Sequence, residues 1–248
     1  MKRLVPLLVV TLAACSTTPP AVPSSSTTQA PAPTTTSPKP DQTYAIHDVF
    51  FQFTNALSEK NGDAALAAVA SKAVATWESY RVHALKSTES QLAALPIGER
   101  SVVYGLRAAV DPAVLRTRTG REVLVTAVQQ GLVSMNTSTR VGYADGTTTV
   151  DESLPDLTRL ILGADVSTGE MAPGNPDAPA PSPPLTVRFV REGEDWKVDL
   201  AVLTEWTTAG LEKLATQRGT TADQVLTDLF AARFGAARAA ELRKPLEG

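Results

Sequence analysis

Apolar residues recur every three or four positions from about residue 43 to residue 132, which is the spacing of an amphipathic helix. The stripe is clearest in Tyr44–Glu59, where the apolar side chains share one face. It stops at Asn61-Gly62-Asp63, where Asp63 is a residue type that can cap the following helix. Further helices are predicted over Ala64–Val69, Ser71–Leu85, Glu89–Leu95, Glu99–Val110 and Arg121–Leu132, with a shorter turn beginning at Asp111-Pro112.

The pattern then changes to alternation, which predicts strands. Thr139–Tyr143 and Thr147–Val150 are rich in β-branched and aromatic residues and flank Ala144-Asp145-Gly146, a typical hairpin turn. Leu157–Leu162 is an apolar run for which periodicity leaves both a strand and a helical turn open. The segment Ala172–Pro184 contains six prolines and is expected to be a loop.

A second hairpin and a helical C-terminus complete the pattern. Leu185–Val190 and Trp196–Leu200 alternate on either side of the polar Arg191–Asp195. From Thr204 the helical spacing returns, with a capping box at Thr221-x-x-Gln224. Helices, then strands, then helices predict an α+β fold, with an α+β domain over residues 43–203 and the helices of residues 204–248 packed on the same domain.

The residues between 16 and 42 have a different composition. Of these 27 residues, 19 are Ser, Thr or Pro, and Val22 is the only large aliphatic side chain. Such a segment buries too little apolar surface to offset the entropy of ordering. Together with Cys15, the segment is therefore expected to form a disordered tether over residues 15–42.

The first 14 residues resemble a bacterial lipoprotein signal peptide. Basic Lys2-Arg3 precedes the apolar run Leu4–Leu12, and Leu12-Ala13-Ala14 leads directly to Cys15, the single cysteine of the chain. The resemblance implies cleavage before Cys15, lipidation of its thiol and acylation of the new N-terminus. A membrane-spanning helix needs about 20 apolar residues, so this run is too short. A plain secretory signal is the competing interpretation, but it does not explain an unpaired cysteine in an exported protein.

Lipidation at Cys15 implies a location and a partner. Two or more acyl chains hold a protein stably on a membrane. The chain is therefore expected in the cell envelope, anchored on the non-cytoplasmic side of a bacterial membrane, and on the outer membrane where the organism has one.

Charge argues against nucleic acid as a partner. Removing Lys2 and Arg3 from the 23 basic residues leaves 21 against 26 acidic ones, a net charge of −5. The segment Leu211–Leu229 faintly resembles a helix-turn-helix, but the charges around it balance. We therefore expect a packed helical hairpin, or a face on which a protein partner docks.

Two further segments together resemble the NTF2-like (SnoaL-like) family. The first runs from Phe50 to Leu57 and continues through Asn61-Gly62-Asp63 to Leu66. The second is Leu185–Leu200, in which Trp196 begins the last strand. The resemblance covers about residues 43–201 and implies helices packed on a curved, mainly antiparallel sheet, a cone that encloses an apolar cavity. The long helical stretch Thr88–Leu132 and the helices after Thr204 depart from the family pattern.

The candidate ligand-binding residues are Trp77, Tyr80, His83, Tyr143 and Trp196. Trp77, Tyr80 and His83 are three residues apart and so share one helix face. That face is either a pocket wall with one titratable group, or core packing with His83 at its solvent end. His47 and His83 lack the spacing of metal ligands, so no metal and no cofactor are predicted. No catalytic residue is assigned.

The sequence thus favours a non-enzymatic envelope lipoprotein that binds a small apolar ligand or an envelope protein. One alternative is an enzyme of isomerase, dehydratase or hydrolase type acting in an apolar NTF2-like cavity. A second is a structural envelope scaffold, which predicts an exposed apolar patch on the last helices.

Overall fold

The computed structural model describes residues 40–135, 139–142, 148–151, 156–163, 165–172 and 185–247. The predictions for the signal peptide, Cys15 and most of the tether, for Tyr143 and the turn beside it, and for the loop at 173–184 lie outside these ranges. In the described part of the chain, ten helices and six strands confirm the predicted α+β class.

The first part of the domain is helical, as predicted. Its helices are α1 (Pro40–Ser58), α2 (Gly62–Ala68), α3 (Lys72–Lys86), α4 (Glu89–Ala93), α5 (Ile97–Ala109), α6 (Pro112–Thr117) and α7 (Gly120–Gln129). The prediction that Asp63 caps α2 was wrong. Asn61 takes that place, and its side-chain oxygen accepts a hydrogen bond from the Ala64 amide at 3.1 Å. Asp63 lies instead in the first turn, where its charge favours the positive end of the helix dipole.

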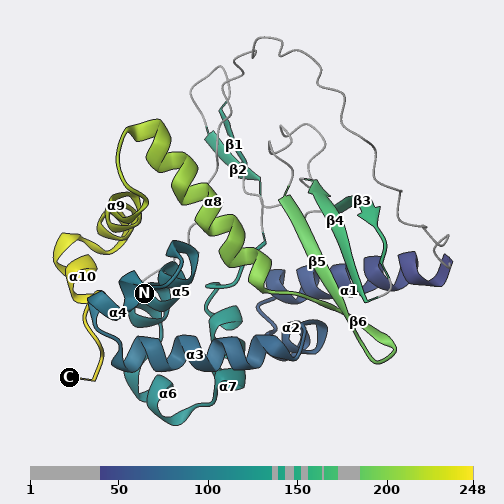
Figure 1. Ribbon diagram of the computed structural model, residues 1–248, viewed down its shortest axis with the longest axis horizontal. Coiled ribbons are helices and arrows are strands. Elements are labelled where there is room, and N and C mark those ends of the chain that lie inside the picture. Colours follow the sequence, from purple (N-terminus) through teal and green to yellow (C-terminus); the bar gives the residue numbers. More distant parts are fainter. Residues whose placement is uncertain are drawn as a thin grey trace, which may run out of the picture.

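The main sheet has four antiparallel strands in the order β3-β4-β5-β6 (Figure 1). They are β3 (Asp156–Ile161), β4 (Val166–Ala172), β5 (Leu185–Glu192) and β6 (Asp195–Val198). The undecided run at Leu157–Leu162 is therefore a strand. The predicted hairpin of β5 and β6 is confirmed, with a two-residue turn in which Gly193 adopts a φ of +66°. Strands β1 (Thr139–Gly142) and β2 (Thr148–Asp151) form a separate two-stranded sheet, and within the described ranges they pair with no other strand.

Strand β4 did not emerge from the sequence pattern, and its buried face explains why. The positions that face the core are Ser167, Gly169 and Met171, and only the last of these is a large apolar residue. A Cβ atom at Gly169 would lie 2.9 Å from the side chains of both Leu157 and Leu160. The strand therefore needs a residue without a side chain where neighbouring β3 packs against it.

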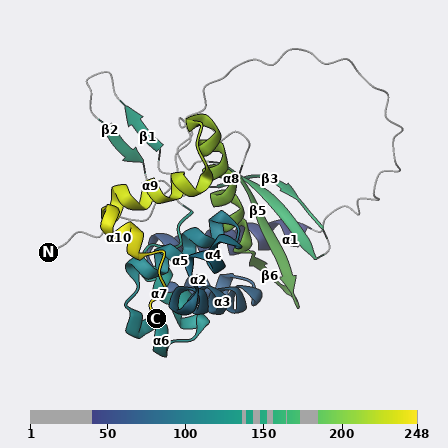
Figure 2. The same cartoon turned by 60° about the vertical axis from the view of Figure 1, so that its left-hand side comes forward.

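Helix α1 covers the core face of the sheet, and the Phe50 and Phe189 rings meet edge to face there with centroids 6.3 Å apart. Helix α8 (Ala201–Arg218) leads from the end of the sheet to α9 (Ala222–Phe234) and α10 (Ala236–Glu241) (Figures 1 and 2). It begins three residues earlier than the predicted helical segment, because the buried Asp199 carboxylate accepts a hydrogen bond from the Ala201 amide at 3.1 Å. That carboxylate also pairs with Lys72 at 2.7 Å and Arg188 at 3.2 Å.

The apolar interior consists of two clusters. The larger lies between the helices α1–α7 and the sheet. The smaller joins α5 to the last three helices, through Ile97, Leu211, Ala215, Val225, Leu226, Phe230, Ala239 and Leu242. The C-terminal helices therefore have a small core of their own, which rests against the start of α5.

Arg107 on α5 fixes the end of the chain to the body of the domain. Its side chain is among the most deeply buried in the protein, with the residue only 1% exposed. The guanidinium donates to four carbonyl oxygens: Ala84 at 2.9 Å, Leu242 at 2.9 Å, His83 at 2.8 Å and Ser87 at 2.6 Å. Three of these carbonyls end α3 and the fourth ends α10. The His83 carbonyl also accepts the Ser87 amide at 3.1 Å, so Arg107 supplies the donor that the helix ends leave missing at the other three. Burial lowers the pKa of Arg107 to about 10, which leaves the group charged at neutral pH.

We expect Gly98→Ala to destabilise the fold, because α5 and α8 touch at this glycine. A Cβ there would lie 2.0 Å from the Thr204 carbonyl oxygen. The cost should be about 1–3 kcal/mol, the usual range for overpacking. Gly210→Ala on α8 is the matched control, since its Cβ would meet nothing within 4 Å, and it should stabilise the helix by about 0.5–1 kcal/mol. Urea unfolding measures both, and equal stabilities for the two variants would contradict the close approach.

Replacing Arg107 by methionine should lower the free energy of unfolding by about 3 kcal/mol or more, because three buried carbonyls lose their donor. Urea unfolding followed by tryptophan fluorescence measures the loss. Arg118→Met is the control, since Arg118 forms an exposed ion pair with Glu122 at 2.7 Å and its removal should cost less than about 1 kcal/mol. Similar losses in the two variants would show that Arg107 does not hold the fold together.

Candidate functional site

The two predicted ligand-binding aromatic residues of α3 lie in the core. Trp77 and Tyr80 on α3 are each 5% exposed, and their rings meet edge to face with centroids 5.9 Å apart. Burial raises the pKa of Tyr80 to about 12, so its hydroxyl keeps its proton at neutral pH. His83 is partly exposed at the end of the same face, with Nδ1 2.8 Å from the Ser87 hydroxyl.

Trp196 on β6 is buried in the same large cluster, on the side of the sheet. The structure therefore places Trp77, Tyr80 and Trp196 in one core, and leaves His83 at its margin. None of the four lines the pocket between α4, α5 and α9, so their role in ligand binding stays a prediction. Tyr143 lies outside the described residues.

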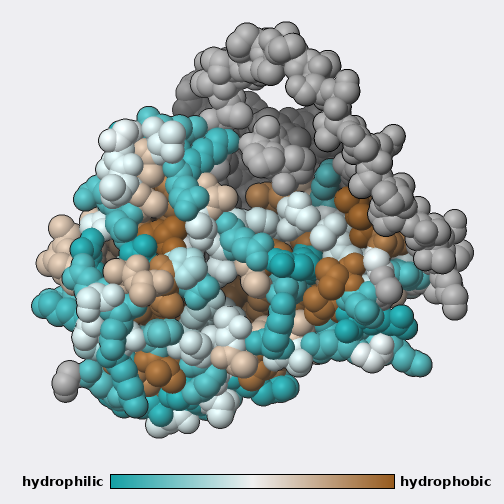
Figure 3. Space-filling model, viewed as in Figure 1, coloured by the Kyte–Doolittle hydropathy of each residue, from teal (hydrophilic) through white to brown (hydrophobic). Residues whose placement is uncertain are grey.

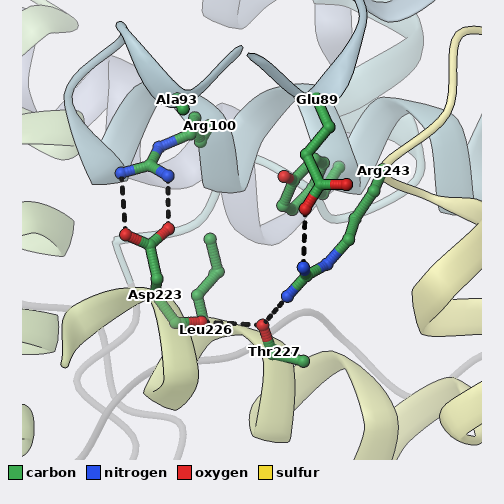
Figure 4. A pocket seen from close by; sticks show the side chains of 8 residues that line it. Glu89, Ala93, Arg100, Asp223, Leu226, Thr227 and Arg243 are labelled. Atoms are coloured by element: carbon green, nitrogen blue, oxygen red, sulfur yellow. Dashed lines mark hydrogen bonds and ion pairs between the residues drawn. The ribbon is translucent and has the colours of Figure 1, made fainter. Parts of the chain in front are cut away.

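A pocket of about 260 Å³ with four charged side chains in its wall lies between α4, α5 and α9, beside the segment that follows α10 (Figure 4). It is small compared with the roughly 300–1,000 Å³ of pockets for drug-sized ligands. Its wall consists of Glu89, Ala93, Arg100, Tyr104, Asp223, Leu226, Thr227 and Arg243.

Two ion pairs cross the pocket (Figure 4). Arg100 of α5 pairs with Asp223 of α9 through both carboxylate oxygens. Arg243, which follows α10, pairs with Glu89 of α4 at 2.6 Å and also donates to the Thr227 hydroxyl. Each pair joins segments on opposite sides of the pocket. The pairs therefore hold the walls together and also place charged groups on them.

Ordinary helix-capping residues position the two carboxylates. Asp223 lies in the first turn of α9, behind the cap formed by Thr221. Glu89 is the first residue of α4, behind the Thr88 capping box. Acidic side chains are favoured at these positions because they face the positive end of the helix dipole. The same rule that starts the two helices therefore places both carboxylates on the pocket wall.

The two arginines differ in exposure. The Arg100 side chain is 12% exposed, against 35% for Arg243. Arg100 Nε is buried and has no hydrogen-bond partner in the part of the chain that the structure describes. A buried donor without a partner is costly, so Arg100 Nε has the capacity to donate one further hydrogen bond. Next to it, burial raises the pKa of Tyr104, so the phenol is a neutral donor in the same wall.

Sequence reasoning missed this pocket altogether. Its charged residues are spread from Glu89 to Arg243, and neither their spacing nor their neighbours form a motif. Glu89 and Asp223 have the sequence signature of helix caps, and Arg100 and Arg243 that of ordinary surface charges. The docking of α9 against α5, through the Tyr104 and Phe230 rings with centroids 5.9 Å apart, brings Asp223 to Arg100, and the segment after α10 brings Arg243 to Glu89.

No group of three or more His, Cys, Asp or Glu side chains in the described ranges is placed to hold a metal ion. Between residues 40 and 247, leaving out the gaps already given, no helix is both long and apolar enough to cross a bilayer.

Comparisons with known proteins do not assign the chain to a family. No protein-family model, no curated protein and no solved structure matches it. The arrangement of the pocket is therefore the main structural guide to what the domain does.

Proposed function

We propose that this chain is a lipoprotein of the bacterial cell envelope, anchored through Cys15, whose globular domain binds a small ligand without catalysing a reaction. The anchor rests on the signal Leu12-Ala13-Ala14-Cys15 and on the Ser/Thr/Pro-rich tether that follows. The binding function rests on one observation, the pocket in which Arg100 and Arg243 both face a common space.

The resemblance to NTF2-like proteins remains part of this proposal. In its support, α1 lies on one face of an antiparallel sheet, and Trp196 is the second residue of β6, the last strand of that sheet in the sequence. The pocket, however, lies where α4 and α5, which depart from the family pattern, meet the C-terminal helices. The proposal therefore assigns binding to that junction, and makes the ligand more polar than the apolar one expected from the sequence.

A second candidate function is docking of an envelope protein on the outer face of the sheet. Ile161 and Val166 are 58% and 50% exposed there, and Val166 pairs with Val190 of β5. Figure 3 shows apolar side chains on the side of the molecule where β3–β5 lie in Figure 1. The described residues with large exposed apolar side chains lie on α1, α3, β3 and β4, and none lies on the last helices where the scaffold hypothesis expected them.

The anchor is tested by expressing the full chain in a bacterial host supplied with an alkyne-labelled fatty acid. The wild type should incorporate the label and remain with the membrane fraction. Cys15→Ala should lose both, since the chain has no other cysteine. An unlabelled wild type that is secreted would favour the plain secretory signal instead.

Binding is tested by native mass spectrometry of the mature chain, extracted gently from membranes. The wild type should carry a co-purifying small molecule, and Arg243→Ala should lose it because the pocket loses a guanidinium. Lys244→Ala is the matched control, since Lys244 pairs with Glu241 at 2.8 Å and does not line the pocket. An empty wild type, or equal retention by the two variants, would speak against binding at this pocket.

A further inference from the structure

The wall of the pocket carries two cations and two anions, and each cation is already paired. Arg100 faces Asp223 and Arg243 faces Glu89, so the four charges sum to zero. A ligand that enters must therefore exchange with existing ion pairs, and the groups that it displaces need new partners. This condition restricts which ligands the pocket can hold.

A ligand of a single charge leaves a wall group unpaired. An anion that takes an arginine displaces its carboxylate, and a cation that takes a carboxylate displaces its arginine. Either exchange leaves one wall charge without its partner, which offsets part of what the new contact gains. A ligand that carries both signs can bind an arginine through one end and a carboxylate through the other, so every charge keeps a partner.

Arg100 provides the position for the negative end. Its Nε is buried and unpartnered in the described chain, and its Nη2 lies 3.5 Å from Asp223, which is a long contact. The Nε edge of a guanidinium is one of the two faces through which arginine holds a carboxylate with paired hydrogen bonds. Asp223 is therefore held mainly through Nη1, and a ligand carboxylate can replace it on Arg100 when the ligand's ammonium takes Asp223 in turn.

We propose that the ligand is a small zwitterion with a carboxylate and an ammonium close together, as in a free α-amino acid. Its carboxylate binds Arg100 and Arg243, and its ammonium binds Asp223 and Glu89. A space of about 260 Å³ suits a molecule of this size. The inference deepens the proposed binding function and rests on it, since it names the ligand class of the same pocket.

The experiment uses the full mature lipoprotein in detergent and measures binding by calorimetry. The probes are the proteinogenic α-amino acids, their N-acetyl derivatives, which keep only the negative charge, and their amides, which keep only the positive charge. At least one free amino acid should bind about tenfold or more tightly than both of its derivatives. The panel also includes short peptides, which carry an ammonium at one end and a carboxylate at the other. Comparing them with free amino acids shows which of the two kinds of zwitterion the pocket binds.

Variants test whether the pocket carboxylates cause the preference for the free amino acid over its N-acetyl derivative. Asp223→Asn and Glu89→Gln each remove a partner of the ammonium and a competitor of the carboxylate. Both carboxylates are about three-fifths exposed, at 62% and 60%, so the variants should fold. The ratio of affinities for the free and the N-acetylated amino acid should fall in each. Glu241→Gln is the control, because Glu241 pairs with exposed Lys244 away from the pocket, and it should keep the wild-type ratio.

Three results would overturn the inference. They are equal binding of free and N-acetylated amino acids, a ratio that the pocket variants leave unchanged, and no binding by any member of the panel. In each case a co-purifying mass in the native spectrum would leave the binding function standing with a ligand of another class. Failure of both experiments would remove the binding function itself.

Discussion

The buried guanidinium of Arg107 is the interaction on which the rest of the structure depends. A single side chain satisfies carbonyls at the ends of two helices that are distant in sequence, α3 and α10. A buried guanidinium is stable only when its N–H groups donate hydrogen bonds to nearby oxygens, as those of Arg107 do. The residue after the Leu242 carbonyl is Arg243, so the clamp also sets where one wall of the pocket lies. Arg238 adds to the clamp from the other side by donating to the Arg107 carbonyl at 3.0 Å.

The domain uses charge in three different ways. Arg107 is paired with dipoles, and Asp199 is a buried carboxylate that pairs with two cations where the sheet meets α8. The pocket holds two pairs that are only partly buried, and exposed or half-exposed pairs contribute little to stability. The first two arrangements are fixed parts of the architecture, whereas the pocket pairs can exchange partners at modest cost. That difference separates a site that can respond to a ligand from charges that only hold the fold.

Much of the fold followed from the sequence, and the exceptions have physical causes. Helical spacing and the alternation around Gly193 gave the helices and the β5–β6 hairpin, because one face of each element is buried in the large core. Strand β4 was not predicted because Gly169 and Ser167 occupy its buried face, so the alternation of large apolar residues is absent. The pocket was not predicted because Glu89 and Asp223 are residue types that are common in the first turn of any helix. Their contacts with the two arginines form only through tertiary packing.

The separate small core of the last three helices has a consequence for the life of the protein in the cell. A unit with few buried apolar side chains opens more readily than the body to which it is attached, and open segments are the ones that proteases cut. A ligand that bridges α4 and α5 to α9 binds only the closed form, so it holds the unit shut by mass action. Under the proposed binding function, the abundance of the protein would follow the supply of its ligand, and an unfilled molecule would be degraded first.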